Sequence, residues 1–589
     1  RRSRPMKILA FLALLALPLL LARCARPPVP GPVAGIRPAE PGQVVGIHLL
    51  SWTSDSLLVE LGKTLPALAE AGINLVILEV DYSFDFQSHP ELRQGGQYIT
   101  RDGARRFAAL CRRHGIRLVP QFQSLGHQSW AKHTYPLLTR YPELDITPGA
   151  FPENEGIYCR EWDPTNPRVN QIVLPLIDEI VDAFQADAIH VGMDEIFLLG
   201  HEQSPTTRGQ DPAALFARVV NEFHRHFVEA KGLEMFMWGD RLIDGRVCPC
   251  GEWESSMNGT APAIDMIPND IVICDWHYEP MAAYCSVPMF MEKGFRVLPS
   301  SWRNVQGAQA LVKYSYGLQH PKLMGHLFTT WGRVEPERLR TYPPMLAGIQ
   351  TIRSGRFFDV AFELRSVSAA GVLEVALAAP DGDLAVHYTA DGSEPTAQST
   401  LYTGPVRLDR SATLRAIACR GDAVVSDVTD KQFVVHKATG RPVYLTPPPS
   451  PKYPPRDGAA ALVNGVTGSD SYADGQWVGA EGPDLVAVVD LGAGTQVSSV
   501  AVNSMNNRGS WVHHSPLVEV FGSPDGQAFT RLGEVADTTS EDHIVRLGVT
   551  FPAAAARYLK VHIHNQIIPE GSSGAGSPAW LFVDEIVVE

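Results

Sequence analysis

The sequence predicts an α/β protein in which a (β/α)8 TIM barrel is followed by two all-β sandwich domains. Between residues 43 and 331, short β-branched segments alternate with longer segments whose apolar residues repeat at helical spacing. Eight strands, each with a crossover helix, in about 310 residues correspond to the size of one closed barrel. Beyond residue 356, short strands alternate with glycine and aspartate turns, which is typical of β sandwiches.

The composition excludes several classes of protein. Of the 589 residues, 45% are hydrophobic, so wholesale disorder is excluded. Lys and Arg total 50 against 64 Asp and Glu, a net charge of −14, which argues against nucleic acid as the main partner because phosphate binding needs a cationic surface. The 8 cysteines show no paired C-x-x-C spacing, so we expect no zinc site, and one or two disulfides are possible.

Residues 1–30 are expected to be a signal segment outside the fold. The apolar run at 8–21 follows a basic flank and is too short to span a bilayer of about 30 Å. We therefore expect an exported protein with no membrane span. Cys24 could carry a lipid anchor, although Arg23 stands where a lipoprotein cleavage site has a small residue.

The barrel is placed at residues 40–356, and its polar residues gather where the predicted strands end. The predicted strands are 44–50, 73–80, 117–122, 188–191, 233–237, 271–274, 295–298 and 325–330, and two of the predicted helices are 103–114 and 169–184. Catalytic groups of such barrels lie at the carboxyl ends of the strands. The residues found at these ends are Glu79, Asp81, Gln123, His127, Asp194, Glu195, Trp238, Asp240, Asp275, Trp276, His277, Trp302 and Trp331. One such residue alone could be a helix cap or a core side chain, but together they predict a site.

The residue types indicate a sugar as the ligand. Four strands end in tryptophan, which predicts a cup of indole rings that stack on a sugar while carboxylates and histidines bind hydroxyls. Four core tryptophans are the alternative. Asp194 and Glu195 are adjacent, so we expect their side chains to point in different directions. Ordinary retaining glycosidases place two carboxylates about 5–5.5 Å apart, commonly on different strands. Adjacent acids instead suit a split role, in which one protonates the leaving oxygen and the other orients a substrate group. A pair of helix-capping acids is the alternative.

Residues 190–195, His-Val-Gly-Met-Asp-Glu, resemble the H-x-G-G-D-E signature of family 20 glycoside hydrolases, the β-N-acetylhexosaminidases. Gly126-His127 and Tyr98-x-Thr100 resemble further segments of that family, and the likeness covers residues 43–355. It is closest to the hexosaminidase D-like branch. The resemblance implies an exo-acting retaining enzyme that removes terminal non-reducing GlcNAc or GalNAc from glycans without a catalytic cofactor.

The resemblance also implies roles for individual residues. Glu195 would protonate the glycosidic oxygen and later activate water, and Asp194 would hold the substrate acetamido group as it forms an oxazolinium ion. The residues assigned to substrate binding are Glu79, Asp81, Gln123, His127, His190, Trp238, Asp240, Trp276, His277, Tyr278, Trp302 and Trp331.

The chain departs from the family pattern at several positions. Met193 replaces the second glycine, Gln123 stands where many members have aspartate, and Arg333 occupies the place of a frequent sugar-binding glutamate. Segment 46–52 lacks the usual sugar-binding arginine, and 299–302 lacks a tyrosine that contacts the acetamido group. The preference between GlcNAc and GalNAc therefore stays open.

Two appendages follow the barrel. Residues 357–440 resemble the small C-terminal β sandwich of chitobiases and are interpreted as a spacer. A proline-rich linker leads to residues 445–589, which resemble a discoidin-like (coagulation factor type C) domain and predict a carbohydrate-binding module. The candidate glycan contacts there are Arg508, Trp511 and His513, whereas Trp477 is expected in the core. The backbone at 464–467 could hold a structural Ca²⁺.

Two other functions remain possible at this point. One is a non-catalytic exported glycan-binding protein on a degenerate barrel, which the missing arginine favours and the intact pair of adjacent acids opposes. The other is a metal-dependent barrel hydrolase that uses His127 and His190, although the sequence offers no compact set of metal ligands.

Overall fold

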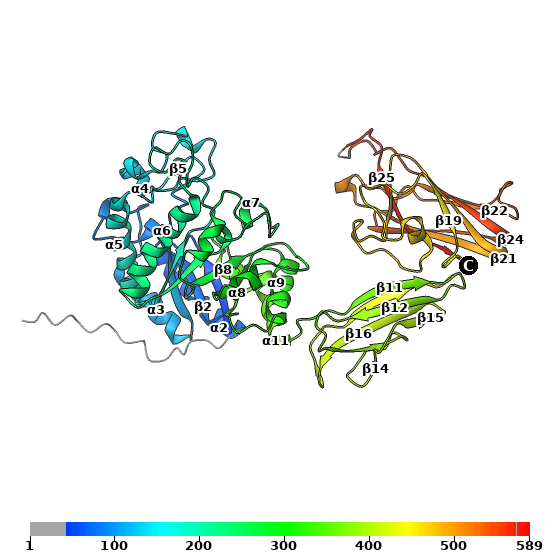
Figure 1. Ribbon diagram of the computed structural model, residues 1–589, viewed down its shortest axis with the longest axis horizontal. Coiled ribbons are helices and arrows are strands. Elements are labelled where there is room, and N and C mark those ends of the chain that lie inside the picture. Colours follow the sequence, from blue (N-terminus) through cyan, green and yellow to red (C-terminus); the bar gives the residue numbers. More distant parts are fainter. Residues whose placement is uncertain (1–42, 573) are drawn as a thin grey trace, which may run out of the picture.

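The computed structural model describes residues 43–572 and 574–589. The predicted signal segment and Cys24 lie outside these residues. Figure 1 shows three units along the chain, an N-terminal α/β unit and two β units that follow it. None of the helices in the described part of the chain is both long and apolar enough to cross a membrane.

The first unit is a closed barrel of parallel strands, as predicted. Its strand order is β1-β10-β9-β8-β7-β6-β3-β2, and β1 and β2 close the ring side by side. All the predicted strands are confirmed, with ends that differ by at most a few residues. The barrel strands are β1 Val44–Leu49, β2 Leu75–Glu79, β3 Arg117–Ser124, β6 Ala188–Gly192, β7 Glu234–Trp238, β8 Val272–Trp276, β9 Arg296–Ser301 and β10 Gly325–Thr329.

Helices surround the barrel and begin where their capping residues predict. The hydroxyl of Thr100 accepts a hydrogen bond from the Gly103 amide and starts α3, and Asn166 caps α5 in the same way. These two are the helices predicted at 103–114 and 169–184. The helices are α1 Asp55–Gly62, α2 Leu65–Ala71, α3 Arg101–Arg113, α4 Pro136–Arg140, α5 Pro167–Phe184, α6 Pro212–His224, α7 Gly251–Glu254, α8 Ser286–Glu292, α9 Val305–Gly317, α10 Pro336–Arg340 and α11 Pro343–Ser354.

Both faces of the barrel strands are buried, which explains their nearly continuous apolar sequences. One set of side chains fills the interior, and the members of that cluster include Leu75, Ile77, Val119, Phe236, Trp238, Val272 and Leu298. The alternate set packs against the helices in a larger cluster that holds Met235, Met237 and Ile273. The barrel is therefore a solid core that can hold a site only at its ends.

The second unit is a small β sandwich of two antiparallel sheets, and it holds the segment interpreted as a spacer. One sheet has the order β11-β12-β15, and in the other β16 pairs with β13, β17 and β18. The strands are β11 Ala361–Val367, β12 Leu373–Ala378, β13 Ala385–Thr389, β14 Thr400–Leu401, β15 Val406–Leu408, β16 Ala412–Arg420, β17 Ala423–Val424 and β18 Thr429–Phe433.

The third unit is a larger all-β domain dominated by two long strands that pair with each other. Register shifts between Asp490 and Thr495, and again between Val497 and Ser499, let these strands bend around the core. Val466 of this region packs into the core of the small sandwich, so the two β units are in contact. The strands are β19 Val443–Thr446, β20 Val478–Glu481, β21 Leu485–Met505, β22 Leu517–Ser523, β23 Thr530–Ala536, β24 Ile544–Ile563 and β25 Trp580–Val588.

Candidate active site

The carboxyl ends of the barrel strands carry a cluster of residues in left-handed backbone conformation. The non-glycine residues with positive φ at these ends are Ser51, Asp81, Leu125, His127, Met193 and Glu195, which follow β1, β2, β3 and β6. Such conformations are costly for residues with a Cβ atom and persist where the surrounding structure enforces them. These strained residues therefore lie at the end of the barrel where catalytic groups are expected.

The backbone after β6 brings the two adjacent acids together. His127 Nε2 lies 3.4 Å from Asp194 Oδ2 and 3.3 Å from Glu195 Oε2. The prediction that the two carboxylates point in different directions is therefore wrong. In an extended strand, successive side chains do alternate, but here φ is +71° at Met193 and +53° at Glu195, so the chain turns and both carboxyl groups face one imidazole.

The same turn explains the glycine of the sequence motif. Gly192 has φ +68°, and a Cβ atom at this position would lie 2.2 Å from the side-chain oxygen of Gln123. Gln123 needs that space, since its side-chain amide donates a hydrogen bond to Asp194 Oδ1. Met193 also has a positive φ, a conformation that glycine adopts more easily than methionine. The second glycine of the family pattern stands at this position.

The charges at this point favour an ionised Asp194 beside a protonated His127. Burial opposes charge on the imidazole, but the Asp194 carboxylate raises the pKa of His127 well above its ordinary value. Burial would likewise raise the pKa of Asp194, yet His127 and the hydrogen bond from Gln123 lower it. The ligand atoms of His127, Asp194 and Glu195 lie within 4.8 Å of one another, which would suit a metal ion. A protonated His127 places a positive charge directly beside Asp194.

Asp240 fixes the backbone of the loop that carries Glu195. Its Oδ2 accepts hydrogen bonds from the Glu195 amide at 2.9 Å and from Arg241 Nε at 2.6 Å, and its Oδ1 accepts one from Trp276 Nε1 at 3.2 Å. Burial raises the pKa of Asp240 to about 6, although Arg241 acts in the opposite direction. Asp240 was predicted to contact substrate, but the structure shows a buried residue that fixes the position of the Glu195 backbone.

Glu79 and Asp81 line a cleft of about 610 Å³ beside the Asp194 site, together with Ser51 and Tyr135. Asp81 accepts a hydrogen bond from the backbone amide of Gln123 at 2.7 Å. Burial raises the pKa of Asp81 to about 7, and burial together with the Asp81 charge raises the pKa of Glu79 well above its ordinary value. Both shifts favour the protonated carboxyl, which can donate a hydrogen bond to a hydroxyl.

The four predicted tryptophans form one aromatic cluster with Tyr278, but they are not equally accessible. Trp331 Nε1 donates a hydrogen bond to the Tyr278 hydroxyl at 2.5 Å, and Tyr278 stacks on Trp276 with 4.9 Å between ring centroids. Trp302 contacts Tyr278 edge-on, at 5.3 Å between centroids. Trp238 and Trp276 are buried, so the predicted cup of four indole rings must be corrected. The partly exposed rings are Trp302, Trp331 and Tyr278.

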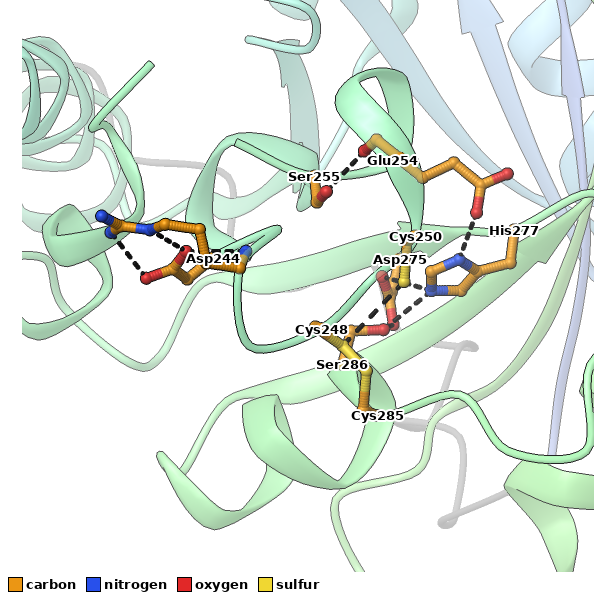
Figure 2. The surroundings of a disulfide bond; sticks show 11 residues. Asp244, Cys248, Cys250, Glu254, Ser255, Asp275, His277, Cys285 and Ser286 are labelled. Carbon is orange, nitrogen blue, oxygen red and sulfur yellow. Dashed lines mark hydrogen bonds and ion pairs between the residues drawn. A yellow bond between two sulfur atoms is a disulfide. The ribbon is translucent and has the colours of Figure 1, made fainter. Parts of the chain in front are cut away.

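Two predicted sugar contacts are fully buried and bind other protein groups. His190 packs on Trp238 at 4.6 Å between ring centroids, and its Nδ1 accepts a hydrogen bond from the Gly192 amide. His277 lies between Glu254 and Ser286, with 2.7 Å from its nitrogens to each partner (Figure 2). Both rings are fully buried, and the candidate metal-ligand groups found among the described residues do not include His190.

Figure 2 also shows a disulfide beside His277. Cys248 of the loop after β7 is bonded to Cys285, which precedes α8, and Cys250 remains a free thiol. The bridge ties two strand-end loops together close to Asp240, and within the described residues it accounts for the predicted one or two disulfides. Burial, with the nearby Asp275 and Glu254 charges, raises the pKa of Cys250 to about 12, which favours the protonated thiol over the thiolate.

Comparison with known protein families bears on this site directly. Residues 53–304 match the family model described as glycosyl hydrolase family 20, catalytic domain. The match covers most of the barrel. Residues 368–430 match the chitobiase/beta-hexosaminidase C-terminal domain, which places the small sandwich beside the family 20 domain as the sequence resemblance implied.

Individual relatives cover only part of the chain. The lacto-N-biosidase of Bifidobacterium bifidum is 23% identical over 196 residues, which are 31% of this chain and 16% of that protein. The beta-hexosaminidase subunit beta of Homo sapiens is 31% identical over 160 residues, 24% of this chain and 26% of that protein. Among solved structures, a chitobiase from Flavobacterium johnsoniae has a TM-score of 0.39 at 18% identity and covers 52% of this chain and 48% of its own.

The barrel also carries aromatic residues near Glu195 that the sequence motifs did not indicate. The ring of Tyr158 lies 5.7 Å from His127 and 4.9 Å from Trp253, and burial together with the neighbouring Glu195 raises the pKa of Tyr158. Trp130 and Trp253 are 56% and 45% exposed, and both contact Tyr158. They come from the long segments between barrel strands, Trp253 from α7 and Trp130 from a short strand, where only their proximity to strand ends could have indicated a role.

The predicted contacts of the C-terminal domain divide into exposed and buried residues. Arg508 and Trp511 lie on the surface, with 48% of Trp511 exposed, whereas His513 is buried and its prediction as a loop contact is corrected. Trp477 is buried, as expected, and donates a hydrogen bond to Ser469. The Asn464 side chain already accepts from the Val466 amide and donates to Asp457, so any Ca²⁺ at 464–467 would have to bind backbone oxygens.

Proposed function

We propose that the protein is an exo-acting retaining β-N-acetylhexosaminidase that removes terminal GlcNAc or GalNAc from glycans. The observation that carries this proposal is the convergence of Asp194 and Glu195 on His127 at the mouth of a family 20 barrel. The two carboxylate oxygens lie within 4.8 Å, which leaves no room for the attacking water of an inverting pair. A non-catalytic glycan-binding protein would not need this arrangement, so it is the weaker candidate.

In the first step, Glu195 donates a proton to the glycosidic oxygen while the acetamido carbonyl oxygen of the substrate attacks C1. The C1–oxygen bond to the leaving group breaks, and an oxazolinium ion forms with inversion at C1. Asp194 accepts a hydrogen bond from the acetamido N–H and stabilises the positive charge of that ion. Because Asp194 is buried and held by Gln123, its charge is in place before the reaction begins.

In the second step, the Glu195 carboxylate takes a proton from water, and the water oxygen attacks C1 on the face that the leaving group occupied. The C1–acetamido oxygen bond breaks, which restores the acetamido group and the original anomeric configuration. Glu195 suits both steps because its side chain is 14% exposed, whereas that of Asp194 is 5% exposed. One carboxyl thus exchanges protons with incoming molecules and the other stays charged.

The stereochemical course provides the test of this function. Hydrolysis of 4-nitrophenyl N-acetyl-β-glucosaminide, followed by ¹H NMR at early times, is expected to show the β-anomer of the sugar first, before mutarotation. Early appearance of the α-anomer would exclude the oxazolinium route. Binding on a glycan array without turnover of any hexosaminide would select the non-catalytic alternative.

His127 is expected to set the acid limb of the pH profile. The imidazolium lowers the pKa of Asp194, so Asp194 stays ionised above that lowered value and loses its charge only as the pH falls through it. His127→Gln removes the cation, raises the pKa of Asp194, and is expected to move the acid limb of kcat/KM upward by about one pH unit or more. His114→Gln at the end of α3 is the matched control, and an unmoved acid limb in the His127 variant would contradict the assignment.

Several further proposals concern the rest of the chain. The signal-like N-terminus supports export to the periplasm, the cell surface or the medium, with a lipid anchor at Cys24 as an alternative form of retention. The C-terminal domain is proposed as a discoidin-like module that binds glycans through Arg508 and Trp511 on its surface. Membership in the hexosaminidase D-like branch and a structural Ca²⁺ at 464–467 stay predictions.

A further inference from the structure

Three neighbouring strands of the C-terminal domain bring two histidines and two carboxylates together. Asp484 immediately precedes β21, His562 lies in β24 opposite Glu519 of β22, and His564 directly follows β24. Strand β24 lies between β21 and β22, so these side chains share one face of the sheet. All four are partly exposed, and the two imidazole rings lie 3.9 Å apart.

Each imidazole is held between the two carboxylates. On one side, Asp484 Oδ2 lies 2.9 Å from His562 Nε2 and 3.2 Å from His564 Nδ1. On the other side, Glu519 Oε2 lies 2.9 Å from His564 Nε2 and 3.6 Å from His562 Nδ1. Four ring nitrogens therefore face two carboxylate oxygens.

All four ring nitrogens point at carboxylate oxygens, and each carboxylate has one oxygen shared between the two rings. Whenever an imidazole is neutral, one of its nitrogens has no proton and presents a lone pair to such an oxygen, an arrangement that a bound cation would satisfy. One divalent cation on the Asp484 side would remove this conflict. It would bind His562 Nε2, His564 Nδ1 and Asp484 Oδ2, and both remaining ring N–H groups would then point at Glu519.

We propose that Asp484, His562 and His564 form a transition-metal site suited to Zn²⁺, with Glu519 as the carboxylate that orients both imidazoles. The three ligand atoms lie within 4.8 Å of one another. A tetrahedral zinc ion with bonds of about 2.0–2.2 Å separates its ligands by about 3.3–3.6 Å, so the present spacings of 2.9 and 3.2 Å need to widen by only a few tenths of an ångström. Two nitrogen ligands favour zinc over calcium or magnesium.

The carboxylates are already positioned for these roles. Asp484 Oδ1 accepts a hydrogen bond from the Asn565 amide at 2.8 Å, which directs Oδ2 toward the histidines. Glu519 Oε1 lies 3.3 Å from Arg531 Nε, which leaves Oε2 for the outer ring nitrogens. Carboxylates that accept the second N–H of a metal-bound histidine fix its tautomer and orientation. The ion would link the start of β21 to the end of β24. The site is independent of the function proposed for the barrel.

The test uses the full chain, freed of metal by a chelator and then titrated with ZnCl₂ alone. Equilibrium dialysis with metal quantification is expected to show one equivalent of Zn²⁺ fewer in His562→Gln, His564→Gln and Asp484→Asn than in the unmodified chain. The test compares the zinc stoichiometry of each variant with that of the unmodified chain, because the cysteines at 248, 250 and 285 could bind zinc elsewhere when reduced. His543→Gln, in the same domain, is the control and is expected to bind as the unmodified chain does.

Two further readouts separate zinc binding from a purely structural role. Glu519→Gln is expected to keep the stoichiometry and weaken Zn²⁺ binding about 10- to 100-fold. The melting temperature of the unmodified chain is expected to rise with ZnCl₂ more than that of His564→Gln, and without zinc the two are expected to melt as equally cooperative folded proteins. Equal stoichiometry in the unmodified chain and all three ligand variants would overturn the proposal. Loss of binding in Glu519→Gln but not in Asp484→Asn would also overturn it, because the ion would then lie on the Glu519 side.

Discussion

Replacing Glu195 with glutamine is expected to reduce kcat for an N-acetyl-β-hexosaminide disaccharide by about 10⁴-fold, at the upper end of what general acid–base catalysis contributes. The amide can neither protonate the leaving oxygen nor activate water, and it therefore impairs both steps. The substitution preserves the shape of the side chain, and the Glu195 backbone amide keeps its hydrogen bond to Asp240. Steady-state kinetics on the purified variant measure the loss.

The leaving group distinguishes acid catalysis from a loss of folding. A dinitrophenyl leaving group departs without protonation, so the first step of the Glu195→Gln variant should be far less impaired with that substrate than with the disaccharide. Glu202→Gln, an exposed residue in the same loop, is the matched control and is expected to leave kcat unchanged. Full activity of the Glu195 variant on the disaccharide would contradict its role.

Asp194→Asn is expected to lower kcat by about 10²- to 10³-fold, comparable to the loss of one preorganised group that stabilises developing charge. The oxazolinium ion carries a positive charge that a neutral amide cannot balance, and the new amide N–H groups face the His127 imidazolium. Because the charge develops mainly in the transition state, kcat should fall much more than KM rises. Steady-state kinetics with an aryl N-acetyl-β-glucosaminide provide both values.

An acidic residue outside the site serves as the control for that variant. Asp244→Asn, in the exposed loop after β7, removes one negative charge and is expected to change kcat little. Its carboxylate binds Arg246 rather than any group at the strand ends of β3 and β6. A similar kcat in Asp194→Asn and Asp244→Asn would show that the Asp194 charge does not take part in catalysis.

The positions of the barrel strands could be predicted from sequence, but the direction of their side chains could not. The strands of a parallel barrel are buried on both faces, so apolar residues do not alternate with polar ones. Within β7, Phe236 and Trp238 fill the interior, whereas Met235 and Met237 pack against the helices. The sequence alone cannot distinguish these two sets, and for this reason Trp238 was assigned to substrate binding.

The two adjacent acids could be placed at the end of a strand from sequence, but their geometry required the structure. Adjacent acids at the end of β6 indicated a site, yet an extended backbone would separate their side chains. The left-handed conformations at Met193 and Glu195 bring the carboxylates together, and local sequence gives no signal of them at non-glycine residues. Tyr158 and Trp253 were missed for a different reason, since they come from long segments between barrel strands whose paths depend on tertiary contacts.

The requirement for the acetamido group tests the central claim most directly. The same enzyme preparation is assayed with the 4-nitrophenyl β-glycosides of GlcNAc, GalNAc, glucose and galactose, with 6-sulfo-GlcNAc added to probe tolerance of charge. Because the acetamido oxygen is the proposed nucleophile, kcat/KM for GlcNAc or GalNAc is expected to exceed that for the matching sugar without it by about 10³-fold or more. Comparable cleavage of the glucoside or galactoside would contradict substrate-assisted catalysis by Asp194 and Glu195.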